Sequence, residues 1–420
     1  MASNSFEFSD WFAMEALRQL LNPLEISPFF NTDYNGEFKK PFPVGTTVHV
    51  PYPKQFVPDP DNTLGYTPQG IIERHTDVTI DRVAKVHFEW DSIEKALKMD
   101  RGREKIAHDI VKPAMTTIRN KIEVDCATWA YQNTPNVVGI LGTNPATFDA
   151  VYGAAGQRLA EISAPAGEHG VFLSPGVTRT LRASVVSQFN PASDVSRMWK
   201  KGLIGEANGF DTYQSNSLRR HTAGTWAGAV TVTTTQTGTT AISSLVLTAT
   251  TGDTFKPGDK FNIAACNEVN PITYLSTGTL KQFTVTNTST VTAASSAATI
   301  TFSPPIYGPG SPYQNVDALP VATAALTLWP GTTSPSGKVG TVGLALGHSA
   351  FALVSVPLDN PPQGGSVEVS SQARDPETGI SVAVLRMFDG FQRKWINRIE
   401  CIYGFGNLYN DHDAVVIAGA

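Results

Sequence analysis

The sequence predicts an α+β protein that carries an inserted, nearly uncharged β module, and three observations lead to this fold class. Near residue 100 the spacing of apolar residues changes from strand-like alternation to a helical repeat. Residues 223–337 contain only seven charged residues, which are Asp253, Lys256, Asp259, Lys260, Glu268, Lys281 and Asp317. After this module the mixed helix and strand pattern resumes, so one domain has two halves that flank an insertion.

The composition narrows the classes of protein that these 420 residues can form. Hydrophobic residues make up 41% of the chain, which is enough for a packed interior and argues against global disorder. The net charge of −5 gives no bulk attraction to nucleic acid or to an anionic membrane. The three cysteines lie far apart, so neither a disulfide framework nor a zinc site is expected. The first residues, MASNSFEFSDWF, do not form a signal peptide, and we expect synthesis in a reducing cytoplasm.

The N-terminal segment, residues 1–37, is predicted to contain a short helix. Ser9 can cap this helix and Pro23 ends it. Its apolar residues recur at helical spacing and are Trp11, Met14, Leu17, Leu20 and Leu21. Two interpretations are open, because the helix can dock on its own chain or act as an arm that reaches a neighbouring subunit.

Residues 38–90 are predicted to form a long β-hairpin, with strands at 45–53 and 75–90. Alternate residues of the second strand form one apolar face, interrupted by Arg82, that consists of Val78, Ile80, Ala84, Val86, Phe88 and Trp90. The tip, residues 54–70, is rich in Pro, Asp and Gly. An isolated hairpin is marginally stable in water, so either a partner chain or the rest of the same chain must cover it.

A long amphipathic helix is predicted from Gly102 to Asn133, within the segment 91–149. Its apolar side consists of Ile106, Ile110, Val111, Ala114, Met115, Ile118, Ile122, Cys126 and Trp129. Pro113 should kink or split the helix near Lys112. Charges of both signs are expected on a solvated outer side that includes Arg103, Glu104, Asp109, Arg119, Lys121 and Glu123.

The remaining chain alternates mixed and all-β patterns. In segment 150–222, helices are expected at 152–162 and 175–189 around a buried strand at 169–175. In the module 223–337, six strands are expected at 228–235, 243–250, 260–265, 279–286, 298–303 and 324–329, which suggests a small barrel or sandwich. Two apolar strands should follow in 338–358, then a loop over 359–379, and then strands at 380–388, 395–404 and 413–418.

The sequence offers weak candidates for catalysis and none is retained. Ser349 lies in Gly-His-Ser-Ala-Phe, which lacks the final glycine of a nucleophile elbow. The Asn-Asp-His-Asp sequence at 410–413 is interpreted as a solvated loop, because adjacent residues point to alternate faces. The histidines show no zinc-helix spacing, and no dinucleotide or P-loop fingerprint is present. We therefore expect no catalytic residue, no cofactor and no metal.

The order of the predicted elements resembles that of the major capsid protein of tailed phages, which has the Hong Kong phage fold. More narrowly, the chain resembles podoviral coat proteins that carry an inserted six-stranded β-barrel. The stretches that carry this likeness are FEFSDWFAMEALRQLLNPL, VGTTVHVPYPKQFV, GDKFNIAACNEVNPITYLSTGTLKQFTVT, LALGHSAFALVSVPL and WINRIECIYGFGNLYNDHDAVVIAG. No single motif is diagnostic, and the ordered set is what indicates the family.

The resemblance implies a division of the chain into the parts of that fold. These are an N-terminal arm (1–37), an E-loop (38–90), a P-domain with a spine helix (91–149), an A-domain in two parts (150–222 and 338–375), an insertion domain (223–337) and C-terminal P-domain strands (376–420). It also implies a virion protein that is assembled in the host bacterial cytoplasm. The implied partners are further copies of the chain in hexameric and pentameric capsomers, scaffolding protein, portal protein, a decoration protein and non-specifically contacted double-stranded DNA, with no membrane.

Six residues are candidates for contacts between subunits. The E-loop supplies Phe56 and Tyr66, and the barrel supplies a charged loop with Asp253, Lys256, Asp259 and Lys260. Two alternative functions stay open at this point, an encapsulin-like compartment shell and a tail-associated or surface-associated β-rich structural protein. An enzyme of unrecognised type is a further alternative, which the absence of convergent polar motifs disfavours.

Overall fold

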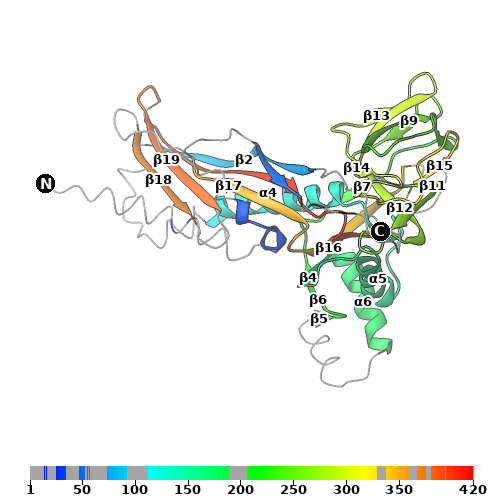
Figure 1. Ribbon diagram of the computed structural model, residues 1–420. Coiled ribbons are helices and arrows are strands. Elements are labelled where there is room, and N and C mark those ends of the chain that lie inside the picture. The colour runs from blue at the N-terminus through cyan, green and yellow to red at the C-terminus, as the bar shows by residue number, and fades with distance from the viewer. Residues whose placement is uncertain are drawn as a thin grey trace, which may run out of the picture. The chain divides into compact units, whose positions relative to one another are not determined.

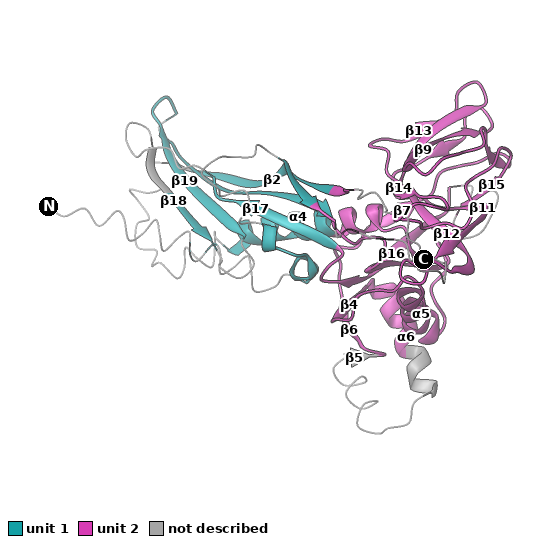
Figure 2. Cartoon of the chain, in the orientation of Figure 1, with its two compact units in different colours: residues 1–50, 76–126, 351–407 teal, residues 51–75, 127–350, 408–420 magenta. Residues whose placement is uncertain are grey.

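The computed structural model describes residues 14, 16, 25–34, 47–52, 54, 56, 73–91, 112–188, 206–328, 337–358, 367–374, 380–392 and 394–419. The chain divides into two compact units (Figure 2). Unit 1 consists of Met1–Val50, Thr76–Cys126 and Phe351–Asn407, and unit 2 of Pro51–His75, Ala127–Ala350 and Leu408–Ala420. Within the described residues, no helix has the length and apolar character that a membrane span requires.

Unit 1 is built on a six-stranded sheet with the order β1-β2-β20-β19-β18, in which β17 also pairs with β20. Its strands are β1 (Thr47–Pro51), β2 (His75–Asp91), β17 (Phe351–Val356), β18 (Val367–Arg374), β19 (Ser381–Asp389) and β20 (Lys394–Asn407). The alternation expected in β2 is confirmed, since Val78 and Ala84 are buried whereas Asp81 and Val83, which lie between them, are exposed. The chain itself covers β2, because β20 pairs with it from Val78↔Gly406 to Asp91↔Lys394.

Strand β18 corrects the prediction of a loop over residues 359–379. The segment Val367–Arg374 pairs antiparallel with β19, with Ser370 opposite Leu385 and Arg374 opposite Ser381. The sequence Val-Glu-Val-Ser-Ser-Gln-Ala-Arg alternates, but the small polar Ser371 stands where a third apolar residue would extend the pattern, and the neighbouring Pro and Gly residues favour a loop. Pairing with the strongly apolar β19 determines the strand, and that partner cannot be read from the local pattern.

Helix α4 (Lys112–Asn133) confirms the apolar side of the predicted helix over the residues that the structure describes. Met115, Ile118, Ile122 and Cys126 are all at most 1% exposed. Pro113 is the second residue of the helix, a position in the first turn where its missing N–H has no helical partner to lose. The predicted upstream half, residues 102–111, lies outside the described residues, as does most of the N-terminal helix.

Glu123 corrects the expectation of a uniformly solvated outer side for this helix. The residue is 3% exposed, and its carboxylate accepts hydrogen bonds from the backbone N–H groups of Ile26 and Ser27 at 2.9 and 3.2 Å. The Ser27 hydroxyl donates a third bond at 2.9 Å. Glu123 therefore caps the short 3₁₀ helix η1 (Ser27–Phe29) and holds the segment that precedes it. Burial raises the pKa of the Glu123 carboxyl, an effect that these three donors oppose.

Unit 2 contains a second sheet, here called the host sheet, with the order β3-β21-β16-β4-β6-β5 and with β7 paired to β16. Its strands are β3 (Val137–Gly139), β4 (His169–Leu173), β5 (Glu206–Ala207), β6 (Phe210–Gln214), β7 (Arg220–Thr222), β16 (Val339–Gly347) and β21 (Ala414–Ala418). The π-helical turn η4 (Asp149–Gly153) and the helices α5 (Ala154–Glu161) and α6 (Pro175–Gln188) lie beside it (Figure 1). Their apolar side chains, with Tyr152 and Leu181 fully buried, share one core with β4, β16 and β21.

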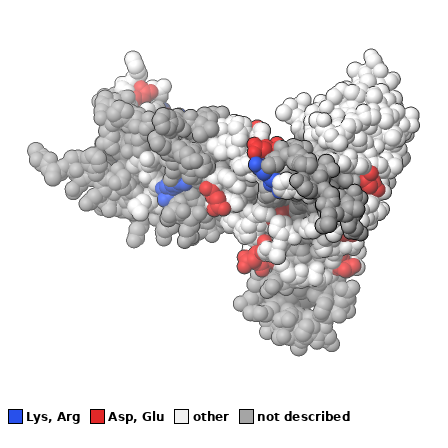
Figure 3. Space-filling view, viewed as in Figure 1, with Lys and Arg blue, Asp and Glu red and all other residues white. Residues whose placement is uncertain are grey.

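The six strand predictions of the module are confirmed as a closed barrel with the order β11-β12-β14-β9-β8-β15. The strands are β8 (Val230–Val232), β9 (Ile242–Thr248), β11 (Lys260–Val269), β12 (Ser276–Val285), β14 (Ala297–Ile306) and β15 (Ala325–Leu328). Phe261, Phe283 and Phe302 fill its interior, with ring centroids 5.4–5.9 Å apart. A small sheet of β10 (Thr254–Phe255) and β13 (Val291–Thr292) was not predicted. The face over β9 and β13 in Figure 3 shows no charged residue.

The two ends of the module lie side by side on the host sheet. Strand β7 enters the module and pairs antiparallel with β16, which leaves it, with Thr222 opposite Val339. The next pair of residues continues this contact, because the N–H of Ala223 donates to the carbonyl oxygen of Lys338 at 2.9 Å. The module is therefore inserted at the point where two paired strands meet.

Candidate functional site: the buried polar junction between the barrel and the host sheet

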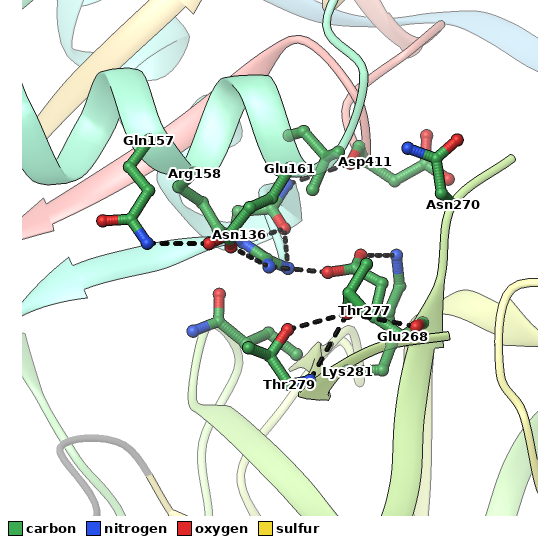
Figure 4. A network of polar contacts seen from close by, with 12 residues as sticks. Asn136, Gln157, Arg158, Glu161, Glu268, Asn270, Thr277, Thr279, Lys281 and Asp411 are labelled. Atoms are coloured by element: carbon green, nitrogen blue, oxygen red, sulfur yellow. Dashed lines mark hydrogen bonds and ion pairs between the residues drawn. The ribbon is translucent and has the colours of Figure 1, made fainter. Parts of the chain in front are cut away.

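Three buried charged residues join the barrel to the host sheet, and we call Arg158, Glu268 and Lys281 the charged trio (Figure 4). Glu268 lies on β11 and Lys281 on the neighbouring strand β12, and each is 2% exposed. Lys281 Nζ lies 2.6 Å from Oε1 of Glu268, and Arg158 Nη1 from helix α5 lies 2.6 Å from Oε2. Each carboxylate oxygen therefore receives one cationic donor, one from each side of the junction.

The remaining donors of Arg158 also have partners. Its Nε and Nη2 donate to Oδ1 of Asn136 at 3.2 and 2.9 Å, and the Asn136 amide donates to the carbonyl oxygens of Asp411 and Ala414. Glu161 Oε2 lies 3.4 Å from Arg158 Nη1, so two cations face two carboxylates. Burial opposes ionisation of Glu268, but the charges of Lys281 and Arg158 outweigh it and hold the pKa of that carboxyl below its ordinary value.

A second group of polar contacts lies where the chain passes into the barrel. Nε2 of His221 lies 2.8 Å from Oδ1 of Asp259, which is 1% exposed. The backbone N–H groups of Gly224 and Lys256 donate to Oδ2 of Asp259 at 3.1 and 2.7 Å. Asp259 therefore ties the first residues of the module to the turn that precedes β11.

Lys260 supplies the neighbouring anchor to the end of α4. Its ammonium donates to the carbonyl oxygen of Tyr131 at 2.6 Å and to the hydroxyl of Thr284 at 2.8 Å. Burial holds the pKa of Lys260 well below its ordinary value, because the charged form loses its hydration there. The Gln282 side chain adds two bonds to the backbone of Val137 on β3, at 2.8 and 3.1 Å.

These contacts place most of the sequence-derived interface candidates inside the chain. Asp253 is 3% exposed and accepts hydrogen bonds from the backbone N–H groups of Ala227 and Thr250. Asp259 and Lys260 are also buried, whereas Lys256 is half-buried and Phe56 is 55% exposed. Tyr66 lies outside the described residues. Contact with a neighbouring subunit stays a prediction for all six residues.

The two discarded catalytic candidates meet in one partly buried cluster around Asp413. The Ser349 hydroxyl and N–H donate to Oδ2 of Asp413 at 2.6 and 3.0 Å, and Nε2 of His169 lies 2.8 Å from Oδ1 of Asp413. In a nucleophilic triad the histidine lies between the serine and the acid, whereas here the carboxylate lies between the other two. The cluster therefore links β4 to the β16–β17 turn and does not prepare a nucleophile.

The interpretation of residues 410–413 as a solvated loop is wrong. Asn410 is 5% exposed and Asp413 is 2% exposed. The Asn410 amide donates to the carbonyl oxygen of Asn133 at 2.6 Å, and Nδ1 of His412 lies 3.0 Å from the carbonyl oxygen of Ile162. The polar residues satisfy backbone groups at the end of α4 and of α5, so their burial is offset by hydrogen bonds.

The charged trio itself was missed by sequence reasoning, although one signal for it exists. Glu268 and Lys281 are two of the seven charges in the module, and both lie inside segments expected to be strands or to continue them. Charges that sit among the apolar residues of a nearly uncharged module indicate buried pairing. The third member, Arg158, is 110 positions from Glu268, so local pattern gives no signal for it.

Comparison with known proteins supplies the family. The family described as "P22 coat protein - gene protein 5" matches residues 69–412. A search of curated protein sequences gives no match. Among solved structures, a chain from Mycobacterium phage Che8 is 13% identical over 94% of this chain and 92% of its own, with a TM-score of 0.49. The Ralstonia phage GP4 capsid is 8% identical over 94% and 88%, with a TM-score of 0.45. The CUS-3 coat protein I-domain is 27% identical over 24% and 96%, with a TM-score of 0.19.

Proposed function

The chain belongs to the P22 coat protein family and is a major capsid protein, and on this premise we propose how its parts build the head shell. Copies of the chain associate into hexameric and pentameric capsomers, which close into an icosahedral shell around packaged phage DNA. The family match over residues 69–412 carries this proposal, because it spans the second hairpin strand, α4, the whole barrel and every strand of the host sheet except β21.

The tip of the E-loop (residues 38–90), which connects β1 to β2, lies across a neighbouring subunit in this arrangement, since β2 itself pairs with β20 of its own chain. Phe56 supports this role, since this large apolar residue is 55% exposed. Burial of such a ring against a neighbour removes apolar surface from water at about 25 cal/mol per Å². Tyr66 of the same loop is a second proposed contact, and Lys256 is the barrel candidate whose side chain is only half-buried.

The barrel acts as a folding and assembly module whose orientation on the host sheet is fixed from within. The hydrogen bonds and ion pairs of the charged trio, Asp259 and Lys260 have preferred directions, so they fix the angle of the barrel on the host sheet. Apolar packing alone would let the barrel slide over that surface. A shell repeats each subunit's geometry many times, so a barrel held at one angle gives every subunit the same outer surface.

The protein acts by assembly and has no catalytic activity. Scaffolding protein guides assembly in the host bacterial cytoplasm, a portal ring occupies one vertex, and a decoration protein is a further candidate partner. The acidic net charge of −5 fits a shell that contacts its double-stranded DNA non-specifically and without strong attraction.

Electron microscopy of the purified full-length protein, expressed with its neighbouring phage genes, tests this function. We expect closed shells tens of nanometres across that contain this chain as the main component. A protein that stays monomeric at high concentration with those genes present would refute the proposal. Shells that form with an enclosed host enzyme and without a portal would favour the encapsulin-like alternative.

A further inference from the structure

An arginine within unit 2 is surrounded by three tyrosine rings. The guanidinium carbon of Arg74 lies 4.9 Å from the ring centroid of Tyr52, 4.8 Å from that of Tyr307 and 4.7 Å from that of Tyr313. Tyr313 is 6% exposed. A small cavity of about 80 Å³, which Tyr52, Arg74 and Tyr313 help to line, adjoins the rings. A guanidinium stacks on aromatic faces better than an ammonium does, so the site favours arginine over lysine.

The residues of this cage come from two separate parts of the chain. Tyr52 and Arg74 are the two ends of the connection between β1 and β2, and the N–H of Tyr52 donates to the carbonyl oxygen of Arg74 at 2.9 Å. Tyr307 and Tyr313 follow β14 of the barrel, with ring centroids 5.9 Å apart. Arg74 therefore ties both ends of the connection to the barrel.

Neighbouring contacts hold the rings in place around Arg74. The Tyr52 ring meets Tyr409 edge to face at 5.7 Å, and its hydroxyl donates to the carbonyl oxygen of Leu408. On the barrel side, the backbone N–H of Tyr307 donates to Oδ1 of Asn315 at 2.9 Å. The Tyr52 ring and the backbone of Tyr307 therefore have contacts that do not involve Arg74.

We propose that Arg74 is a positioning residue for shell assembly, which transmits the fixed orientation of the barrel to both ends of the β1–β2 connection, at the tip of the E-loop. This inference rests on the proposed function, in which the E-loop contacts a neighbouring subunit. The barrel then has a second role beyond its own surface contacts, because it determines where the β1–β2 connection begins and ends. Loss of Arg74 should leave the fold intact and make assembly irregular.

The test compares the full-length protein with the variants Arg74→Ala and Arg74→Lys, and with Arg220→Ala as the matched control. Arg220 is an exposed arginine on β7, in the same unit. Hydrogen exchange measures the exchange rate of the Tyr52 amide and compares it with the rates of the amides in the barrel strands. Electron microscopy reports the fraction of particles that are closed and of uniform diameter.

For Arg74→Ala we expect at least tenfold faster exchange at Tyr52, unchanged exchange in β11 and β12, and a several-fold lower fraction of closed shells. Arg74→Lys should be intermediate, and Arg220→Ala should match the wild type. A thermal midpoint within a few degrees of wild type would separate positioning from a loss of folding. If Arg74→Ala does not fold, the Arg74→Lys variant carries the comparison.

Two outcomes separate this inference from the proposed function. Uniform shells of wild-type diameter from a folded Arg74→Ala variant, or unchanged exchange at Tyr52, would overturn the role of Arg74 while the shell function stands. Failure of the wild-type chain to form shells would overturn the shell function and the assembly role together. In that case faster exchange at Tyr52 would support only the anchoring contact itself.

Discussion

Oε2 of Glu268 accepts a 2.6 Å hydrogen bond from Nη1 of Arg158, although the two residues are 110 positions apart in the chain. One residue belongs to the inserted barrel and the other to a helix of the host sheet. Their contact is possible only when both parts are folded and docked, so it couples the stability of the module to that of its host. The consequences can be measured.

Replacing Glu268 by Gln should strongly destabilise the chain, because it leaves the buried charge of Lys281 without a counter-charge and Arg158 with only the more exposed Glu161. Breaking a buried pair in this way costs about 3–5 kcal/mol. Urea unfolding of the full-length protein measures the loss. The control is Glu161→Gln at the more exposed edge of the network, where we expect less than about 1 kcal/mol. Equal effects of the two variants would contradict the central role of Glu268.

The isolated module, residues 223–337, should fold into a β domain by circular dichroism, because its barrel is closed and has its own aromatic core. In this fragment Arg158 is absent and the junction is open to water, so Glu268→Gln should cost less than about 1 kcal/mol. If Glu268→Gln lowers the unfolding free energy of the fragment as much as that of the full chain, then Arg158 and the host sheet do not contribute to the stabilising effect of Glu268.

Gly224→Ala should disrupt the start of the module. A Cβ at this position would overlap the carbonyl oxygen of Thr254 and lie 2.9 Å from Oδ2 of Asp259, and backbone cannot yield as a flexible side chain does. We expect a loss above about 3 kcal/mol, or loss of soluble protein. Gly167→Ala is the matched control, since nothing lies within 4 Å of the added Cβ, and it should change stability by less than about 0.5 kcal/mol.

Glu123→Ala should release the segment around η1 from α4. The change leaves the N–H groups of Ile26 and Ser27 without their acceptor, which costs about 1–3 kcal/mol for each buried donor. Hydrogen exchange at Phe29 and Phe30 should become at least about 30-fold faster, the equivalent of about 2 kcal/mol. Asn120→Ala, an exposed change on the same helix, should leave these amides unaffected. Unchanged exchange in Glu123→Ala would exclude a capping role.

The stability of unit 2 should fall as the pH rises above about 6.5. The hydrogen bond to Asp413 raises the pKa of His169, an effect that burial opposes and the Asp413 charge reinforces. A group with a raised pKa in the folded state contributes its full stability below its unfolded value of about 6.5 and loses it as the pH rises through the folded value. Urea unfolding between pH 6 and 8.5 measures this slope, which His169→Gln should reduce. The exposed His87 provides the control substitution, which should leave the slope intact.

Local pattern was sufficient for most of the fold. The six barrel strands and the strands β16, β17, β19, β20 and β21 alternate or run apolar strongly enough to be placed within a few residues. β18 was missed because it has few apolar residues and lies between Pro and Gly residues, and its partner strand supplies the pairing. The prediction of helix α4 succeeded because Met115, Ile118 and Ile122 repeat on one side.

The buried polar residues could not be predicted by the same reasoning. A charged residue in a helical pattern is normally predicted to face solvent. That rule is wrong for Glu123, because the backbone N–H groups of Ile26 and Ser27, 96–97 positions away in the sequence, donate hydrogen bonds to its buried carboxylate. Asp413 and Glu268 are similar cases, since their partners His169 and Arg158 are distant in sequence. Burial of these groups depends on tertiary contacts that no short window contains.

Because the two ends of the module lie side by side, the module could be removed or replaced without moving the strands of the host sheet. Because Ala223 and Lys338 are hydrogen-bonded neighbours, a short turn could close the gap if residues 224–337 were excised, and β7 and β16 would keep their register. Such a shortened subunit would also need Arg158 replaced by an apolar residue, since its buried counter-ion would leave with the excised part. The same location offers a place to graft an unrelated domain, so that a closed particle would display many copies of it.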